Sequence, residues 1–552
     1  MNLTRSAVLA GALSAALALV FVPSANASTE PVKVQLLGLN DFHGHLESTT
    51  PGTIREFPTS DPVRAGGAEY LATHVRELEK SNPNTMVVSA GDLIGASPLL
   101  SALFHDEPTI EAMNRIGLDL NAVGNHEFDE GATELLRMKN GGCHPTDGCL
   151  DGDGFGGAQF GFLAANVVDK QSRQPLFAPY AIKKFDGVKV GFIGMTLEGT
   201  PEIVTPTGIS HLDFLDEADT ANKYAEELRR QHGVRAIVVL LHEGGAQVSP
   251  FGINGCNGIS GPIVDIVGRT SKAVDLFVTG HTHQPYNCVI DGRPVTSASS
   301  FGRLVTDIDM TLDRQSKDVS SVTVNNRIIT QTVDKAADIS ELMGKYDAIA
   351  APLRNRVIGS TTEVLSRTPN AAGESPLGDV IADAQLEATT PADKGGAVAA
   401  FMNPGGVRAD LDAGDVTYGE AFTVQPFGNS LVTMTLTGAQ IDTLLEQQWC
   451  GQTSPRILLP SAGFQYSWDS TKPVCDRVDP AGIQLNGVPL DPTASYRITV
   501  NSFLASGGDA FKVLPDGTNR LGGDIDLDAF EAYFKAHSPV AAPPLDRITK
   551  VA

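Results

Sequence analysis

Side chains that bind metal ions and transfer protons recur where five apolar runs of the sequence end. They are Asp41 and His43 after VKVQLLGLN, Asp92 after VVSAG, Asn125, His126 and Asp129 after LNAVG, His242 after AIVVLL, and His281 and His283 after LFVTG. A single histidine after a strand is more often a structural or solvated residue than a ligand. Sites of open α/β sheets, however, form beyond the carboxyl ends of strands, so five such ends predict one shared site.

The mixture of groups in this set indicates which ligand the site would take. Carboxylate, amide and imidazole groups together suit borderline divalent cations such as Mn, Zn, Co or Fe. In two-metal sites the ions lie about 3.5–4 Å apart, polarise phosphoryl oxygens and activate water, and a carboxylate can bridge them. The sequence therefore predicts a centre of two divalent metal ions.

The elements that must position these residues alternate in type along the chain. Strand-like runs are separated by helix-like segments such as AEYLATHVRELEK and ADTANKYAEELRRQHG from Val32 to about Asn326. This alternation predicts an α/β domain with largely buried sheets. Residues 335–357 have helical apolar spacing and no reactive groups, which favours a linker helix, and a second α/β domain follows from about Ile358.

Five sequence blocks, in order, carry a family resemblance. The blocks D-x-H, G-D, G-N-H-E, H-E-G-G and G-H-T-H resemble those of the calcineurin-like metallophosphoesterases. Nearly all of residues 30–550 resemble the bacterial periplasmic 5′-nucleotidase/UDP-sugar hydrolase family. The resemblance implies a calcineurin-like four-layer metallophosphoesterase sandwich at residues 28–334, the linker helix at 335–357, and an α/β nucleotide-binding domain, the 5′-nucleotidase C-terminal domain, at 358–552.

The same resemblance implies roles in the first domain. One metal ion would be held by Asp41, His43, Asp92 and His283, and the other by Asp92, Asn125, His242 and His281. His126 is similar to the family's catalytic histidine, and Asp129 would fix its tautomer and favour its protonated form. His126 would stabilise the charge that develops on the phosphate or the leaving oxygen. Glu127 is expected to form a structural salt bridge.

Substrate-binding residues are implied in the second domain, by resemblance to the family's nucleoside site. They are Asn403, Arg408, Phe427, Phe503 and Asp509. Two aromatic rings can stack on a base for roughly 1–3 kcal/mol per base, and arginine can meet phosphate or sugar oxygens. Core positions for the phenylalanines and a surface ion pair for Arg408 are the alternatives. The family usually has a further arginine shortly before GESPLGD; Arg367 lies further upstream, and a substrate contact there is left open.

The N-terminus is typical of a secretory signal peptide. Arg5 precedes the apolar run AVLAGALSAALALVFV, and SANA offers a cleavage site after residue 27. A retained membrane anchor is the alternative, but the apolar run is short for a span. We expect a secreted, extracellular or cell-envelope protein without stable membrane insertion after cleavage.

Six cysteines in an exported chain predict three disulfides. Fifteen connectivities are possible for six cysteines. Proximity in sequence favours Cys143–Cys149, Cys256–Cys288 and Cys450–Cys475, with free buried thiols as the alternative.

The net charge of the chain limits which ligands it can bind. The formal charge is −24, and removing Arg5 with the signal peptide makes it −25. Such a charge disfavours nucleic-acid polymers. A small phosphate ester would be repelled as well, unless bound cations invert the local potential.

These observations predict a secreted dimetal 5′-nucleotidase that hydrolyses nucleoside 5′-monophosphates. UDP-sugars and 2′,3′-cyclic nucleotides are further candidate substrates. The alternatives are a secreted nucleotide-binding protein without turnover and a related phosphodiesterase or thiosulfohydrolase. The oligomeric state is left open.

Overall fold

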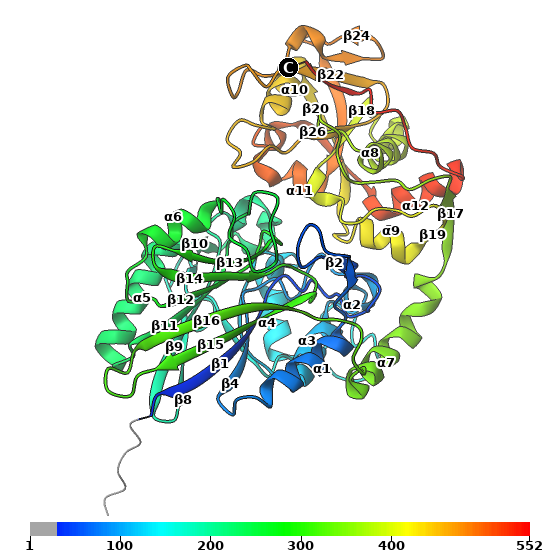
Figure 1. The fold of residues 1–552 in the computed structure, drawn as a ribbon. Helices are drawn as coiled ribbons and strands as arrows, with labels where there is room; N and C mark the ends of the chain where they lie inside the picture. Colours follow the sequence, from blue (N-terminus) through cyan, green and yellow to red (C-terminus); the bar gives the residue numbers. More distant parts are fainter. Residues whose placement is uncertain (1–29, 552) are drawn as a thin grey trace, which may run out of the picture.

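Two six-stranded sheets stack face to face in the N-terminal part of the protein (Figure 1). The structure is a computed structural model that describes residues 30–551, so the signal peptide predicted at residues 1–27 lies outside the described residues. The first sheet has the order β16 (Val319–Ile328), β15 (Leu304–Leu312), β1 (Val32–Leu39), β4 (Thr85–Ser89), β5 (Leu118–Ala122) and β6 (Gly161–Leu163). The second has the order β13 (Pro285–Ile290), β14 (Arg293–Ala298), β12 (Leu276–Thr279), β11 (Ala236–His242), β9 (Val188–Thr196) and β8 (Tyr180–Phe185).

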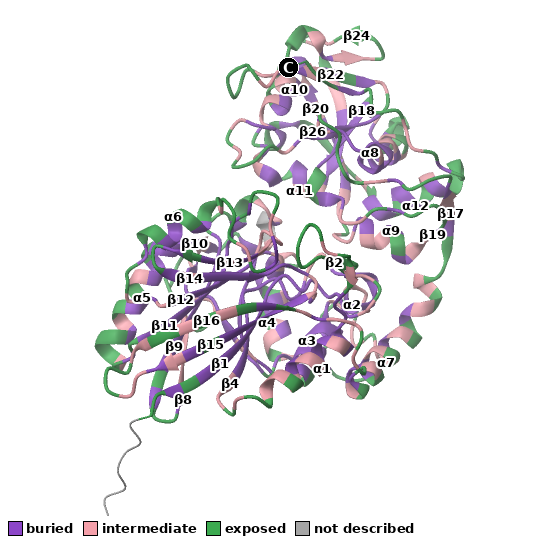
Figure 2. Cartoon of the chain, in the orientation of Figure 1, coloured by how far each residue is buried: buried purple, intermediate pink, exposed green. Residues whose placement is uncertain are grey.

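The strands that precede the candidate ligands pair in parallel. β1 pairs with β4 and β4 with β5 in the first sheet, and β11 pairs with β12 in the second. Leu36 and Val88 of the first sheet meet Phe192 and Val238 of the second in a buried apolar layer. Figure 2 shows that these strands are buried along most of their length. Burial on both faces explains why their sequences are continuously apolar rather than alternating.

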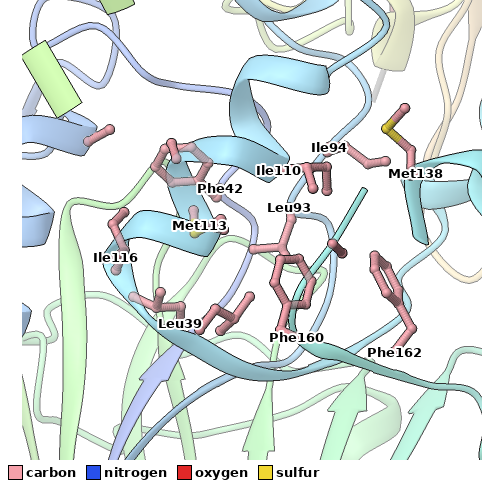
Figure 3. Close-up of a cluster of buried hydrophobic side chains, with 14 of the residues drawn as sticks. Leu39, Phe42, Leu93, Ile94, Ile110, Met113, Ile116, Met138, Phe160 and Phe162 are labelled. Carbon is pink, nitrogen blue, oxygen red and sulfur yellow. The ribbon is translucent and has the colours of Figure 1, made fainter. Parts of the chain in front are cut away.

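Helices cover the outer faces of both sheets. Those against the first sheet are α1 (Ala68–Glu79), α3 (Glu107–Ile116) and α4 (Gly131–Asn140), and those against the second are α5 (Glu217–His232) and α6 (Pro262–Arg269). Figure 3 shows the core under the first group, where Leu39 of β1 and Met113 and Ile116 of α3 belong to one buried cluster. The helix–sheet–sheet–helix order confirms the predicted four-layer sandwich. Shorter elements lie in the connections: α2 (Leu99–Ala102), β2 (Thr53–Ile54) with β3 (Val63–Arg64), and β7 (Val167–Asp169) with β10 (Leu212–Phe214).

The predicted linker helix forms as α7 (Ala337–Arg354). Its residues Ile339, Leu342, Tyr346 and Ala350 recur every three or four positions and are buried. This spacing places them on one face of a helix, and that face packs against the core of the first domain. α7 therefore belongs physically to the N-terminal domain and leads into β17 (Val357–Thr361) (Figure 1).

The C-terminal domain is built around a mixed five-stranded sheet. Its order is β21 (Leu459–Pro460), β18 (Ala399–Met402), β25 (Ser495–Asn501), β20 (Ser430–Thr437) and β26 (Thr518–Ile525). One face packs on α10 (Gly438–Glu446), and the other on α8 (Pro376–Thr389) and α12 (Asp526–His537), while α9 (Tyr418–Val424) packs against α12. The remaining elements are α11 (Ser502–Ala505), the strand β19 (Gly414–Thr417) beside β17, and the small sheet β24 (Val488–Pro489), β23 (Gln484–Leu485), β22 (Phe464–Trp468) and β27 (Ile548–Lys550). The predicted second α/β domain is thus confirmed.

Disulfides form between the cysteines that are nearest in sequence. The pairs are Cys143–Cys149, Cys256–Cys288 and Cys450–Cys475, as predicted. Across residues 30–551, no helix combines the length and the apolar character that a bilayer crossing requires.

Candidate active site

The candidate ligands converge where the carboxyl ends of the two parallel strand groups meet. Asp41 and His43 follow β1, Asp92 follows β4, Asn125 follows β5, His242 ends β11, and His281 and His283 follow β12. All except His281 and His283 are buried, and those two are partly buried. Since the two groups of strands come from different sheets, the site exists only because the sheets stack.

Backbone conformation at these turns is unusual. Asp41, His43, Asp92, His281 and His283 all have φ between 47° and 71°, in the left-handed region that non-glycine residues rarely adopt. Such conformations persist where the surrounding structure enforces them, and they cluster at functional sites.

Close packing at this site also restricts which residue can occupy position 124. A Cβ on Gly124 would lie 2.1 Å from Asp92 Oδ1 and 2.7 Å from the Asp92 backbone nitrogen. Only glycine fits there, because any side chain would displace the Asp92 carboxylate.

Asp92 occupies the centre of the cluster. Its Oδ2 lies 2.9 Å from His242 Nε2 and 3.6 Å from His43 Nε2. On one side, His43 Nε2 is 3.2 Å from His283 Nε2, which is 3.3 Å from Asp41 Oδ1. On the other side, Asn125 Oδ1 is 3.2 Å from His242 Nε2 and 3.0 Å from His281 Nδ1. Asp92 is thus the residue common to two groups of potential ligand atoms.

Hydrogen bonds behind the histidines fix their tautomers. His242 Nδ1 donates to the carbonyl oxygen of Ala90 at 2.7 Å, and His43 Nδ1 donates to that of Gly95 at 2.8 Å. A carbonyl only accepts, so Nδ1 carries a proton in both rings and Nε2 is the atom that points into the cluster. Backbone acceptors of this kind orient metal-ligating histidines.

The pKa values of the histidines in the cluster also bear on metal binding. Burial lowers the pKa of His43 well below its usual value and, together with His242, lowers the pKa of His281 to about 3, which keeps both rings neutral. Burial acts the same way on His242, but the Asp92 carboxylate outweighs it and raises the pKa of His242 to about 10. A proton and a divalent cation therefore compete for the place between His242 and Asp92. The donor set, with several oxygen and imidazole lone pairs aimed at one another, fits divalent cations.

His126 lies beside the cluster, and its ring is held by Asp129. Its Nδ1 is 2.8 Å from Asp129 Oδ2, and its backbone N–H donates to Asp92 Oδ1 at 2.9 Å. Burial lowers the pKa of His126, but the carboxylates of Asp129 and Asp92 more than offset this and raise it. The ring remains 15% exposed and faces a cavity, so it combines a stabilised charge with access to a ligand.

The salt bridge expected for Glu127 is wrong. Its carboxylate accepts from the backbone N–H groups of Asp92 and Leu93 at 2.9 Å and of Gly124 at 2.5 Å. No lysine or arginine pairs with it within residues 30–551. Glu127 instead joins the turns after β4 and β5, which carry Asp92 and Asn125, because three amide donors there need an acceptor out of reach of water.

A cavity of about 710 Å³ extends from this cluster to the C-terminal domain. From the first domain it is lined by Asp92, Asn125, His126, Asp129, His281 and His283, and from the second by Asn403, Arg408, Phe427, Phe503 and Asp509. Asp41, His43 and His242 lie beneath this lining and are wholly buried. All the residues predicted from the sequence are therefore brought together around one cavity of a size typical for small-molecule sites.

Aromatic and cationic groups connect the two domains across the cavity. The ring of Phe427 stacks on that of His126 with 5.9 Å between centroids, and the Arg408 guanidinium lies 5.7 Å from the Phe427 centroid. Arg367 does not line the cavity; its Nη1 donates to the carbonyl oxygen of Val407 at 3.2 Å. The arginine left open by the sequence is thus near Arg408 but outside the cavity lining.

Sequence reasoning missed a hydrogen-bonded chain in the part of the cavity wall that the C-terminal domain supplies. Asn501 Nδ2 donates to Asn403 Oδ1 at 2.9 Å, and Asn403 Nδ2 donates to Asp509 Oδ2 at 3.0 Å. Arg456 Nη1 donates to the other oxygen, Asp509 Oδ1, at 2.7 Å. Asn501 begins the block that contains Phe503 and could have been included from there, whereas nothing in the segment GQTSPRILLP distinguishes Arg456 from a surface arginine.

Comparisons with known proteins agree with this architecture. Residues 34–285 match the family model of the calcineurin-like phosphoesterases, and residues 357–516 match that of the 5′-nucleotidase C-terminal domain. Endonuclease YhcR of Bacillus subtilis is 33% identical over 95% of this chain, which spans only 41% of that relative. Cell wall protein Lmo0130 of Listeria monocytogenes is 32% identical over 93% of this chain and 68% of its own length.

A solved structure shares the whole two-domain arrangement. The 5′-nucleotidase precursor from Thermus thermophilus is 29% identical, with a TM-score of 0.75 over 94% of this chain and 99% of its own. The ordered ligand cluster, the two matched domains and these relatives agree with one another. The chain therefore belongs to the 5′-nucleotidase family and is a metal-dependent phosphoester hydrolase.

Proposed function

We propose that this hydrolase is an exported two-metal 5′-nucleotidase that releases phosphate from nucleoside 5′-monophosphates. The observation that supports the proposal is the single cavity shared by the two domains. The first domain lines this cavity with the ligand cluster and His126, and the second lines it with Phe503 and Asp509. A nucleoside monophosphate has the same polarity, with charge at one end and a stacking, hydrogen-bonding group at the other.

The ligand cluster would hold the metal ions in two groups that share Asp92. The first group is Asp41, His43, Asp92 and His283, and the second is Asp92, Asn125, His242 and His281. Divalent ions bound there supply Lewis-acid polarisation of phosphoryl oxygens and activation of water. The Nδ1 bonds to Ala90 and Gly95 keep His242 and His43 oriented for this task before any ligand binds.

His126 and Arg408 would act on the phosphate. Asp129 accepts a hydrogen bond from Nδ1–H of His126, so Nε2 is the atom left to face the substrate. Protonated His126 can donate a hydrogen bond to the oxygen on which charge develops as the ester bond breaks. Arg408 lines the same cavity beside Phe427 and can bind phosphate oxygens.

The C-terminal residues would bind the nucleoside. Phe427 and Phe503 are both partly exposed within the cavity, as stacking platforms must be. Asp509, which Asn403 and Arg456 hold in place, can accept hydrogen bonds from ribose hydroxyls. UDP-sugars and 2′,3′-cyclic nucleotides contain the same nucleoside and phosphate groups, and we include them as further substrates to test.

Export is the second part of the proposal. The disulfides Cys143–Cys149, Cys256–Cys288 and Cys450–Cys475 suit an oxidising compartment outside the cytoplasm. A fractionation of expressing cells, with the cleaved N-terminus determined by sequencing, tests it. Export predicts a mature chain that begins near residue 28, and retention of an intact N-terminus in the cytoplasm would contradict this.

Phosphate release from AMP by the chain lacking residues 1–27 tests the enzymatic proposal. We expect activity that is lost after treatment with EDTA and restored by Mn²⁺. Bis(p-nitrophenyl) phosphate and single-stranded DNA serve as parallel substrates. If the metal-restored protein cleaves DNA but not AMP, the nucleotidase proposal is wrong and a nuclease is favoured.

A further inference from the structure

Arg456 is a cavity-lining arginine whose role the proposed reaction does not explain. It lies in the segment between α10 and β21, and its side chain is 29% exposed. The segment is anchored, since the Arg456 N–H donates to the Gln448 carbonyl at 2.9 Å and the Leu458 N–H to Gln448 Oε1 at 2.6 Å. The Cys450–Cys475 disulfide holds its start. The side chain of Arg456 thus projects from a firmly held loop into the cavity.

Only one nitrogen of the Arg456 guanidinium donates a hydrogen bond within the described part of the protein. Nη1 donates to Asp509 Oδ1, and among the described residues Nε and Nη2 find no acceptor. A guanidinium carries five N–H donors and no acceptor. Arg456 therefore offers uncommitted donors at the cavity wall.

The position of Arg456 distinguishes it from Arg408. Arg408 lies beside Phe427, which stacks on His126 at the metal end. Arg456 lies on Asp509, and the preceding Gly508 is so close to Phe503 that a Cβ there would meet the ring at 2.5 Å. The two cavity arginines thus have different neighbours, Arg408 beside the Phe427–His126 pair and Arg456 beside Asp509, so we assign Arg408 to the phosphate and Arg456 to the nucleoside.

A nucleoside carries no negative charge, so donors beside it must meet neutral acceptors. Asp509 is suited to the ribose hydroxyls, which leaves the base as the partner of Arg456. A 6-oxopurine presents two adjacent acceptors, O6 and N7, that match the arginine fork, whereas adenine presents N7 beside an amino group that is itself a donor. Facing adenine, the guanidinium would leave a donor against a donor.

Resting on the proposed nucleotidase function, we propose that Arg456 is a specificity-determining residue that favours nucleotides of 6-oxopurines over those of adenine. Its donors bind the O6 and N7 edge of the base while Asp509 binds the ribose. Asp509 also holds the guanidinium in place, so little side-chain freedom is lost on binding.

IMP and AMP provide the test because their bases differ only in the groups on and beside C6. We expect the wild-type kcat/KM for IMP to exceed that for AMP by about tenfold or more, within the range of a bidentate arginine contact. The difference should lie mainly in KM, since the contact exists before and during reaction. R456M and R456K should both bring the IMP-to-AMP ratio to within about twofold of one, because lysine keeps the charge but not the fork.

The IMP-to-AMP ratio of kcat/KM is insensitive to indirect effects of the substitution on Asp509. Losing Arg456 also leaves Asp509 without its cationic partner, but the ribose is the same in both substrates and this loss cancels. R235M, at an exposed arginine of the first domain, is the matched control and should keep the wild-type ratio. A wild-type ratio at or below one, or a ratio that survives in both Arg456 variants, would overturn the proposal.

Binding of inosine and adenosine, measured by calorimetry, separates this inference from the proposed function. Neither nucleoside has a phosphate, so their dissociation constants do not depend on turnover. Failure of the wild-type protein to hydrolyse IMP and AMP would refute the nucleotidase proposal alone. A preference for inosine that R456K removes would still support the role of Arg456, and equal affinities would refute it.

Discussion

Asp92 and His242 come from different sheets, yet Asp92 Oδ2 lies only 2.9 Å from His242 Nε2. Asp92 follows β4 and His242 ends β11, so the contact depends on the stacking of the two sheets. Asp92 also approaches His43 and fixes the backbone of His126. One carboxylate thus links both ligand groups to the proposed catalytic histidine.

Asp92→Asn should therefore remove metal binding and activity together. The amide offers one oxygen where two are used, and its NH₂ would face a histidine lone pair or a metal ion. We expect kcat/KM for AMP to fall by at least about 100-fold, the upper range for residues that merely support a metal ligand. Metal content by mass spectrometry should fall in parallel, while Asp309→Asn, at an exposed position of β15, should change neither. Full metal content with lost activity would contradict the bridging role.

Gly124→Ala should inactivate the enzyme without touching a functional group. The new Cβ would overlap Asp92 Oδ1, so the carboxylate must move. A displacement of about 1 Å at a reacting centre can cost about 100-fold in rate. Gly268→Ala in α6 has open space around it and should be neutral or slightly stabilising, which makes it the matched control. Equal activity of the two variants would show that the site tolerates this movement.

The sequence was sufficient for the fold class and for the cluster at the strand ends. Continuous apolar runs mark strands buried on both faces, and the polar residues that follow them must lie at one edge. Glu127 and Arg456 show why other contacts of the site could not be derived from the sequence. Glu127 binds backbone amides of two turns, and Arg456 binds a residue 53 positions away. Neither relationship leaves a pattern in residue type or spacing, because both depend on tertiary packing.

Glu127→Ala should destabilise the N-terminal domain and weaken metal binding. Three backbone N–H groups would lose their buried acceptor, at about 1–3 kcal/mol for each group left unsatisfied. We expect a loss of about 3 kcal/mol or more in urea unfolding, together with a higher Mn²⁺ requirement for activity. Glu226→Ala, at an exposed position of α5, should change stability by less than about 0.5 kcal/mol. Unaltered unfolding of the Glu127 variant would exclude a structural role for the three hydrogen bonds.

Phe503→Leu should separate nucleoside binding from phosphoester chemistry. Loss of one stacking partner costs roughly 1–3 kcal/mol, or about 5- to 150-fold in KM for AMP. Bis(p-nitrophenyl) phosphate lacks a nucleoside, so its hydrolysis should be unchanged. An equal loss on both substrates would show that Phe503 supports the fold rather than the base.

His105 lies outside the cluster of candidate metal ligands, and it predicts that the stability of the protein depends on pH. Its Nδ1 is 2.9 Å from Glu130 and its Nε2 is 2.9 Å from Asp147, while the ring stacks on that of His144 at 3.8 Å. The hydrogen bond to Glu130, opposed by burial and supported by Asp147, raises the pKa of His105 from 6.5 to about 9. The folded-state pKa is thus above the unfolded one, so protonated His105 stabilises the fold.

The sign of the effect follows from linkage. The stabilisation is fully present below about pH 6.5 and is lost as the pH rises through about 9. Both carboxylates are nearly half exposed, so we expect only about 1 kcal/mol, or about 2–4 °C in Tm. His105→Gln should lower Tm at pH 6 by this amount and match the wild type above pH 9.5. A Tm difference that stays constant from pH 6 to 10 would mean that His105 contributes packing rather than charge, since a neutral contact does not titrate.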